Sequence, residues 1–156
     1  MKNKLGLVLI MLTAMMSAYS QGPDDELDII QSLFGIEKHL AVAEFLQLED
    51  GASNKFWEVY EAYETERKAL GKRRFDLLNK YVEAYFELSD ETTAAMMKES
   101  IALNKSYDKL IVKYYKKVRK TNGEKTAAQF YQVEVYLKTY IRTVLFSSLP
   151  FVGEVE

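Results

Sequence analysis

Few side chains in this sequence are of the types that usually carry out catalysis. Its 156 residues include a single histidine, His39, and no cysteine. A cysteine nucleophile, a disulfide framework and a thiolate metal site are therefore excluded, and a transition-metal site would have to be carboxylate-rich. The sequence also has no glycine-rich phosphate loop, no nucleophile elbow and no catalytic Ser/His/Asp set. We therefore expect a protein that is not an enzyme and that holds neither a metal nor another cofactor.

Two arginines at inward helical positions are the next candidates for a functional role. In the segment from about Ala52 to Leu88, inner positions that step by four and three form a heptad seam, and this seam contains Arg67 and Arg74. An inward arginine must find a carboxylate or extend its stem to solvent. Glu134, on the apolar face of a later segment, could supply that carboxylate. Extension to the edge of a narrow bundle is the alternative.

Basic residues are concentrated in the middle of the chain. Residues 24–66 contain 12 acidic and 2 basic side chains, whereas residues 67–80 contain 6 basic side chains and one acidic. A second basic run, residues 113–120, would face the glutamates of residues 58–66 across an antiparallel hairpin, so we expect most of its charge to be compensated. The candidate partner-binding surface is the basic cluster that remains: Arg67, Lys68, Lys72, Arg73 and Arg74.

One aromatic pattern occurs twice, in residues 55–60 (KFWEVY) and in residues 129–134 (QFYQVE). The two copies are either a true repeat or two amphipathic helices that share a spacing. Both interpretations predict that the aromatic side chains are buried, because rings at helical spacing usually pack in a core. The predicted structural core is Phe56, Trp57, Tyr60, Phe130, Tyr131 and Glu134.

Helices are expected to position these residues. The chain has only two prolines, Pro23 and Pro150, so no proline interrupts a helix between them. Turn signals at residues 48–53, 88–90 and 121–123 divide this part into four helices. The second helix would be roughly 55 Å long at ~1.5 Å per residue, so we expect an elongated, all-α molecule.

The break near Ser89 is short enough to allow only an antiparallel hairpin of the second and third helices. The first helix is expected to begin near Asp25 and to present an apolar stripe. The stripe consists of Ile29, Leu33, Ile36, Leu40 and Ala43.

The first 20 residues have the features of a secretory signal, with Lys2 and Lys4, an apolar run and a small-residue site that ends at Ser20. We expect cleavage there and no stable membrane insertion afterwards, because the run is shorter than the ~20 residues that span a bilayer; a retained anchor is the alternative. Export without cysteine is typical of a bacterial periplasmic protein.

The formal net charge of −2 gives no general attraction to nucleic acid. The expected organisation is a signal at 1–20, a linker at 21–24, a helical domain at 25–147 and a tail at 148–156.

Several segments of the chain resemble the Spy/CpxP-like (LTXXQ-motif) periplasmic proteins, and most of all their Bacteroidetes branch, labelled as sensors of extracytoplasmic-function sigma factors. The segments that carry the resemblance are residues 46–48 (LQL), 55–60 (KFWEVY), 67–70 (RKAL) and 124–134 (EKTAAQFYQVE). The resemblance implies a four-helix protein whose long hairpins pair into a cradle-shaped homodimer.

The resemblance also implies two alternative functions. One is ATP-independent, chaperone-like holding of unfolded or envelope proteins. The other is an accessory role, in which the protein binds the periplasmic part of an envelope-stress signalling protein such as an anti-sigma factor or a sensor kinase. Family members that sense metals do so through histidines, and this chain has only one.

Overall fold

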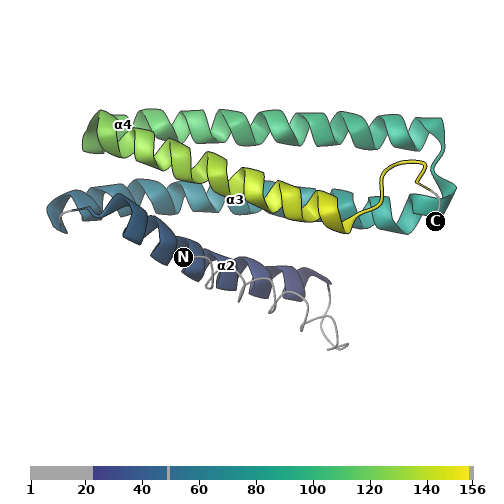
Figure 1. The fold of residues 1–156 in the computed structure, drawn as a ribbon, viewed down its shortest axis with the longest axis horizontal. Coiled ribbons are helices and arrows are strands. Elements are labelled where there is room, and N and C mark those ends of the chain that lie inside the picture. The colour runs from purple at the N-terminus through teal and green to yellow at the C-terminus, as the bar shows by residue number, and fades with distance from the viewer. Residues whose placement is uncertain (1–22, 49, 155–156) are drawn as a thin grey trace. The chain divides into compact units, whose positions relative to one another are not determined.

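The described part of the chain is almost wholly helical. The computed structural model describes the backbone of residues 23–48 and 50–154 and the side chains of residues 35–48 and 55–154; the expected signal lies outside them. This part contains three α-helices and no strand, which confirms the all-α prediction (Figure 1). The elements are α2 (Pro23–Leu46), α3 (Asp50–Ala84), the 3-10 helix η2 (Tyr85–Glu87) and α4 (Asp90–Ser148). No helix among these residues is long and apolar enough to cross a membrane.

The junction between α3 and α4 has the capping residues that its sequence predicts. α3 tightens into η2, and α4 begins after the N-cap Ser89. The Ser89 hydroxyl accepts a hydrogen bond from the Thr92 amide at 3.2 Å, which satisfies one of the amides that a helix start leaves unpaired. Asp90 and Glu91 place negative charge in the first turn, where the helix dipole favours it.

α4 changes direction at a single residue. Gly123 has φ 84° and ψ 174°, a backbone conformation that essentially only glycine adopts. The sequence predicts a break here and four helices in all, whereas the described residues form three α-helices, because the segments on both sides of Gly123 belong to α4. Residues 90–122 are named arm A, and residues 124–148 are named arm B.

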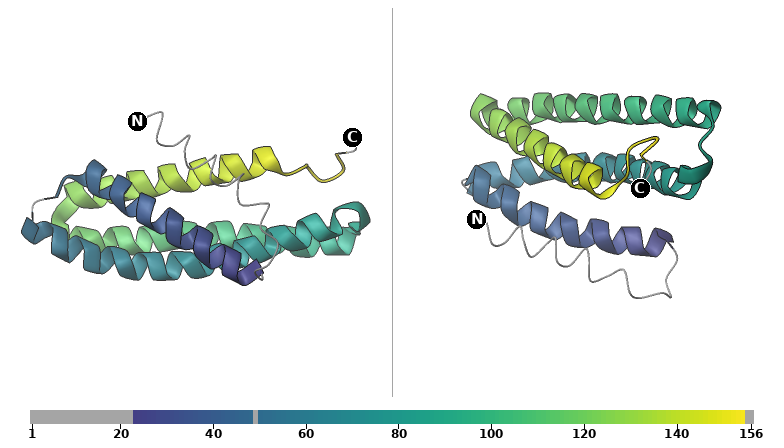
Figure 2. Two further views of the ribbon diagram at one scale, coloured as in Figure 1. Left: turned by 90° about the horizontal axis from the view of Figure 1, so that it is seen from below. Right: turned by 45° about the vertical axis from the view of Figure 1, so that its right-hand side comes forward.

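α3, arm A and arm B lie side by side (Figures 1 and 2). Arm A runs in the direction opposite to α3, and arm B returns along arm A. The ion pairs that join them are Lys113–Glu66 (2.6 Å) and Arg73–Glu99 (2.6 Å) between arm A and α3, and Lys138–Asp108 (2.5 Å) between the two arms.

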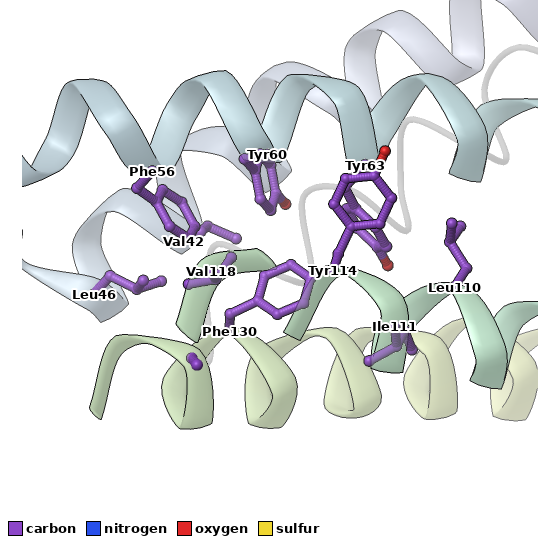
Figure 3. Packing of buried hydrophobic residues seen from close by; sticks show 11 residues of the cluster. Val42, Leu46, Phe56, Tyr60, Tyr63, Leu110, Ile111, Tyr114, Val118 and Phe130 are labelled. Carbon is purple, nitrogen blue, oxygen red and sulfur yellow. The ribbon is translucent and has the colours of Figure 1, made fainter. Parts of the chain in front are cut away.

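The chain divides into two compact units, residues 1–37 and 38–156, and the second contains an aromatic core (Figure 3). Tyr63 packs edge-on against Phe130 and Tyr114, with ring centroids 5.2 and 5.4 Å apart. Each such pair contributes about 0.5 to 1.5 kcal/mol beyond the burial of its area. The core residues are Val42 and Leu46 of α2; Phe56, Tyr60 and Tyr63 of α3; Leu110, Ile111, Tyr114 and Val118 of arm A; and Ala127 and Phe130 of arm B.

The face of α2 that joins this core is not the one that the sequence predicts. Ile36 and Leu40 are exposed, and the buried face consists of Lys38, Val42 and Leu46, which are four residues apart. The prediction is wrong because it was drawn from apolar residues alone, whereas a lysine can be buried when carboxylates meet its charge. Of the other expected stripe residues, Ala43 is exposed, and the side chains of Ile29 and Leu33 lie outside the described residues.

The described part of the C-terminal tail is held by two tyrosines. Residues 151–154 form a turn closed by a 3.0 Å hydrogen bond between the last amide and the first carbonyl, and Gly153 supplies the positive φ of 79°. The Tyr85 hydroxyl lies within hydrogen-bond distance of both the first carbonyl (3.1 Å) and the last carbonyl of the turn. The Tyr81 hydroxyl donates to the Pro150 carbonyl at 2.7 Å. The tail is therefore attached through its backbone.

Candidate functional site

A buried lysine is the centre of a charge network that joins three helices. Lys38 of α2 is only 3% exposed. Its Nζ donates hydrogen bonds to Glu64 Oε1 of α3 at 2.6 Å and to Glu134 Oε2 of arm B at 2.8 Å. A buried charge is stable only when it is paired and hydrogen-bonded, and Lys38 meets both conditions. The charge network is defined as Lys38, Tyr60, Tyr63, Glu64, Arg67 and Glu134.

Two tyrosines of α3 complete the hydrogen bonding of Glu134. Tyr60 donates to Oε1 at 3.0 Å, and Tyr63 donates to Oε2 at 2.6 Å. The Lys38 Nζ also lies 5.4 and 5.0 Å from the centroids of the two rings, a distance at which cation–π attraction operates. Burial, followed by the charge of Glu134, raises the pKa of Tyr60 and of Tyr63 far above the ordinary value of 10.0. Both hydroxyls therefore remain hydrogen-bond donors.

Arg67 brings the network to electrical balance. Its Nε donates to Glu64 Oε1 at 2.8 Å. Burial opposes the ionisation of Glu64, but the charges of Lys38 and Arg67 outweigh it, and the pKa of Glu64 is lowered. Burial likewise opposes the charge of Arg67, but Glu64 outweighs it, and the pKa of Arg67 is raised. The network therefore combines two basic side chains, Lys38 and Arg67, with two acidic side chains, Glu64 and Glu134.

This geometry is suited to holding helices in place. The charged groups of the network already meet partners within the protein, and the two tyrosines are held protonated, so these six side chains are poorly suited to act as nucleophiles or bases at neutral pH. Removing one partner of a buried ion pair costs about 3 to 5 kcal/mol, because the remaining charge is left uncompensated. We interpret the network as the element that fixes the register of α2, α3 and arm B.

Glu134 pairs with a lysine that the sequence did not suggest. The candidates were Arg67 and Arg74, whereas the structure pairs Glu134 with Lys38 and pairs Arg67 with Glu64. Neither Lys38 nor Glu64 was among the residues that the sequence singled out. The available signal for Lys38 was its position in a series with a four-residue spacing, Lys38, Val42 and Leu46.

The five basic residues of the candidate partner-binding surface do not form one continuous surface. Arg67 is mostly buried in the charge network, which removes it from the candidates for contact with a partner. Arg73 and Arg74 contact arm A, and their partners there are Glu99 at 2.6 Å and Asn104 at 2.9 Å. The Arg74 guanidinium also lies 4.9 Å from the centroid of the Tyr107 ring. Lys68 and Lys72 are exposed.

The second basic run, residues 113–120, is compensated less than the sequence predicts. Lys113 pairs with Glu66 at 2.6 Å, and Arg119 pairs with Glu124 of its own helix at 3.6 Å. Hydrogen bonds from Lys113 and then Tyr114 lower the pKa of Glu66. Other glutamates of residues 58–66 that were expected to face this run contact α2 instead. The difference arises because Lys38 and His39 of α2 lie against these glutamates.

The predicted aromatic core is mostly but not wholly inside the protein. Phe56, Tyr60 and Phe130 are buried, and Trp57 is half-buried. Tyr131 is 42% exposed, so the expectation of burial is wrong for this residue. Phe130 occupies the inward position, and the next residue is turned by about 100° around the helix.

The single histidine contributes to packing. The His39 ring stacks on Trp57, with centroids 3.7 Å apart, and its Nδ1 lies 3.8 Å from Glu61. Within the described residues, no group of three or more His, Asp or Glu side chains is placed to hold a metal ion.

Apolar side chains are exposed where α3 turns into α4. Phe86 is 95% exposed, and Val82, Phe151 and Val152 are exposed as well. Tyr85 lies between the two segments, because its ring packs edge-on against Phe86 at 5.2 Å and its hydroxyl binds the carbonyl of Phe151. These four exposed residues, Val82, Phe86, Phe151 and Val152, are named the tip patch.

Comparison with known proteins adds no further constraint on this site. No protein-family model matches the chain, and neither a curated protein nor a solved structure is significantly similar to it.

Proposed function

We propose that this chain is a non-enzymatic holding protein of the bacterial periplasm, which binds unfolded or envelope proteins without ATP. It is exported through its first 20 residues. It acts as an elongated homodimer of four-helix subunits, in which arms A and B count as separate helices and the hairpin of α3 and arm A forms one side of a cradle. It belongs with the Spy/CpxP-like proteins that it resembles.

The observation that carries the proposal is the tip patch. Large apolar residues on a protein surface lose contact with solvent when a partner covers them, and clustered exposed apolar residues often mark such a contact. Here Phe86 is almost fully exposed beside Val82, Phe151 and Val152. A polypeptide that exposes apolar segments would gain burial by docking there.

Basic side chains near the middle of α3 provide the second part of the client surface. Lys68, Lys72 and Arg73 are exposed there, whereas Arg67 belongs to the charge network. Contacts of this kind are screened by salt, while apolar contacts are not. Holding through both surfaces is therefore expected to weaken only in part at high ionic strength.

Aggregation of a chemically denatured client, followed by light scattering, tests the proposal. The protein is expected to suppress aggregation at a several-fold molar excess without ATP. The Phe86→Ser/Phe151→Ser variant is expected to be several-fold less effective, while a Tyr136→Ser/Tyr140→Ser control removes two exposed aromatic rings of arm B and keeps full activity. Far-UV circular dichroism checks that both variants are folded. Absence of suppression by the unaltered protein would refute the holding function.

The ordered tail favours a second candidate, an accessory regulator that binds the periplasmic part of a membrane signalling protein such as an anti-sigma factor or a sensor kinase. Tyr81 and Tyr85 fix the backbone of the tail, so Phe151 and Val152 are presented in one geometry. A preorganised surface suits one defined partner better than many clients. A pulldown from the cell envelope is expected to recover one partner in stoichiometric amount, and a random mixture of proteins would count against this role.

A further inference from the structure

Five lysines form a line along the outer face of arm A. Their spacing is seven, four, seven and four residues, so at 3.6 residues per turn they fall within a sector of about 60°. The first and last lysines are 22 positions apart, or about 33 Å at ~1.5 Å per residue. All five side chains are exposed. This lysine stripe consists of Lys98, Lys105, Lys109, Lys116 and Lys120.

The charge of the lysine stripe is not compensated within the described part of the protein. None of its five side chains takes part in an ion pair there. Arm A makes its ion pairs from the flanks of the stripe instead. The flanking residues are Glu99, Asp108, Lys113 and Arg119, with partners Arg73, Lys138, Glu66 and Glu124. A straight row of like charges therefore remains open to solvent on a chain whose net charge is −2.

Apolar side chains accompany the lysines. Ile101 and Val112 are exposed and lie at the edge of the same sector. The stripe has no aromatic ring on which a nucleic-acid base could stack, and its five charges are ammonium groups without the bidentate geometry of arginine. The chemistry of this face is that of point charges with aliphatic side chains between them.

We propose that the lysine stripe docks arm A lengthwise on an anionic lipid bilayer. A bilayer surface is flat over tens of ångströms, so all five ammonium groups of a straight helix reach lipid phosphates at once. Ile101 and Val112 then enter the boundary between headgroups and acyl chains, as the apolar face of an interfacial helix does. A folded acidic protein would have to present a matching row of carboxylates, whereas an anionic bilayer offers negative charge at every position.

Docking of this kind is separate from the holding function. The tip patch and the lysine stripe involve different residues, and the stripe begins eight residues after Asp90, where α4 begins. An attached protein would keep the tip patch available to clients. A negative result for lipid binding therefore does not refute the holding function, and a negative result for holding does not refute lipid binding.

Vesicle co-sedimentation of the chain from residue 21 onward, the form left after the expected cleavage, tests the proposal. The probes are vesicles of phosphatidylcholine alone and vesicles that contain about one third phosphatidylglycerol. Each lysine near an anionic surface contributes roughly a fivefold gain in partitioning, so Lys105→Gln/Lys109→Gln/Lys116→Gln is expected to reduce binding to the anionic vesicles on the order of 100-fold. The matched control, Lys55→Gln/Lys80→Gln/Lys125→Gln, changes the net charge equally at three exposed positions outside the stripe. It is expected to bind within a few-fold of the unaltered protein.

Two further conditions separate the stripe from other modes of binding. Raising the salt to 0.5 M shortens the Debye length to about 4 Å and is expected to release most of the protein. Ile101→Ser/Val112→Ser is expected to weaken binding while the salt dependence remains. Binding that is equal for neutral and anionic vesicles, or equal for the stripe variant and its control, would overturn the proposal. Binding to heparin or DNA without binding to vesicles would overturn the proposal and indicate a polyanion as the partner of the stripe. Salt-reversible self-association without vesicle binding would overturn it and indicate a second copy of the chain as the partner.

Discussion

Replacing Lys38 by methionine is expected to destabilise the protein by about 3 to 5 kcal/mol. Methionine keeps an unbranched stem but removes the Nζ that binds Glu64 at 2.6 Å and Glu134 at 2.8 Å. Two hydrogen bonds to charged groups are lost, each worth about 1.5 to 3 kcal/mol. Glu64 keeps Arg67, and Glu134 keeps its two tyrosine hydroxyls, so the loss remains within this range.

A double-mutant cycle separates the ion pair from the loss of packing. Glu134→Gln removes the charge of the carboxylate and keeps one oxygen, which can accept one of the two tyrosine hydrogen bonds. In Lys38→Met/Glu134→Gln the remaining charged pair, Glu64 and Arg67, is balanced. The double variant is therefore expected to be more stable than the sum of the two single effects predicts, by about 1 to 3 kcal/mol.

Urea unfolding at pH 7 measures these free energies. The single tryptophan, Trp57, reports on the junction of α2 and α3 because its ring stacks on His39, and far-UV circular dichroism reports on the helices as a whole. Coincidence of the two signals establishes a two-state transition. Lys55→Met, at an exposed position of α3, is the control and is expected to change stability by less than about 0.5 kcal/mol. A cost below about 1 kcal/mol for Lys38→Met, or strict additivity in the cycle, would refute the role of the network.

Three further predictions concern pH and backbone conformation. Folding lowers the pKa of Glu64 from 4.5, so ionised Glu64 stabilises the fold above pH 4.5, and this stability is lost as the pH falls through the folded pKa. The urea midpoint is therefore expected to fall less between pH 7 and pH 3 in Glu64→Gln than in the unaltered protein. Folding raises the pKa of Tyr60 and Tyr63, so their contribution is complete below pH 10.0 and is lost as the pH rises; tyrosinate absorbance of these two residues is expected to appear together with loss of helical circular dichroism. Gly123→Ala is expected to lower the free energy of unfolding in urea by about 1 to 3 kcal/mol, and the cause is the φ of 84° alone, since no atom lies within 4 Å of the added Cβ. Gly35→Ala, in helical backbone, is the control and is expected to raise it by about 0.5 to 1 kcal/mol.

The helical class and the positions of the helix ends could be predicted because they depend on local signals. Ser89 followed by two acidic residues specifies the start of α4, and a glycine after Asn122 specifies the bend. Two prolines at the margins leave the interior free to be helical. Each of these signals acts over a few residues, which is the range that a single sequence reveals.

The buried face of α2 could not be predicted, because residues far away in the chain determine it. Lys38 binds one carboxylate 26 positions away and another 96 positions away. From α2 alone, Ile36 and Leu40 are the better candidates for burial, since lysine is almost never fully buried without partners. The pairing of Glu134 was left open for the same reason: an inward carboxylate indicates that a cation is needed but does not indicate which one.

The lysine stripe and Lys38 together show how the distribution of carboxylates decides the role of a lysine. Lys38 faces two glutamates and becomes part of the core, whereas on the outer sector of arm A the carboxylate of Glu91 lies seven residues before the first lysine of the stripe, and the stripe lysines lie beside one another. Lysines four residues apart on a helix repel by about 0.2 to 0.5 kcal/mol per pair, and Lys105→Gln/Lys109→Gln/Lys116→Gln removes three such pairs. Glutamine has nearly the helix propensity of lysine, so this variant is expected to be about 0.5 to 1 kcal/mol more stable in urea unfolding at low salt. A loss of more than about 1 kcal/mol would mean that the lysines support the fold. A gain in stability, together with loss of vesicle binding, is the combination expected of residues that serve a partner at the expense of the free protein.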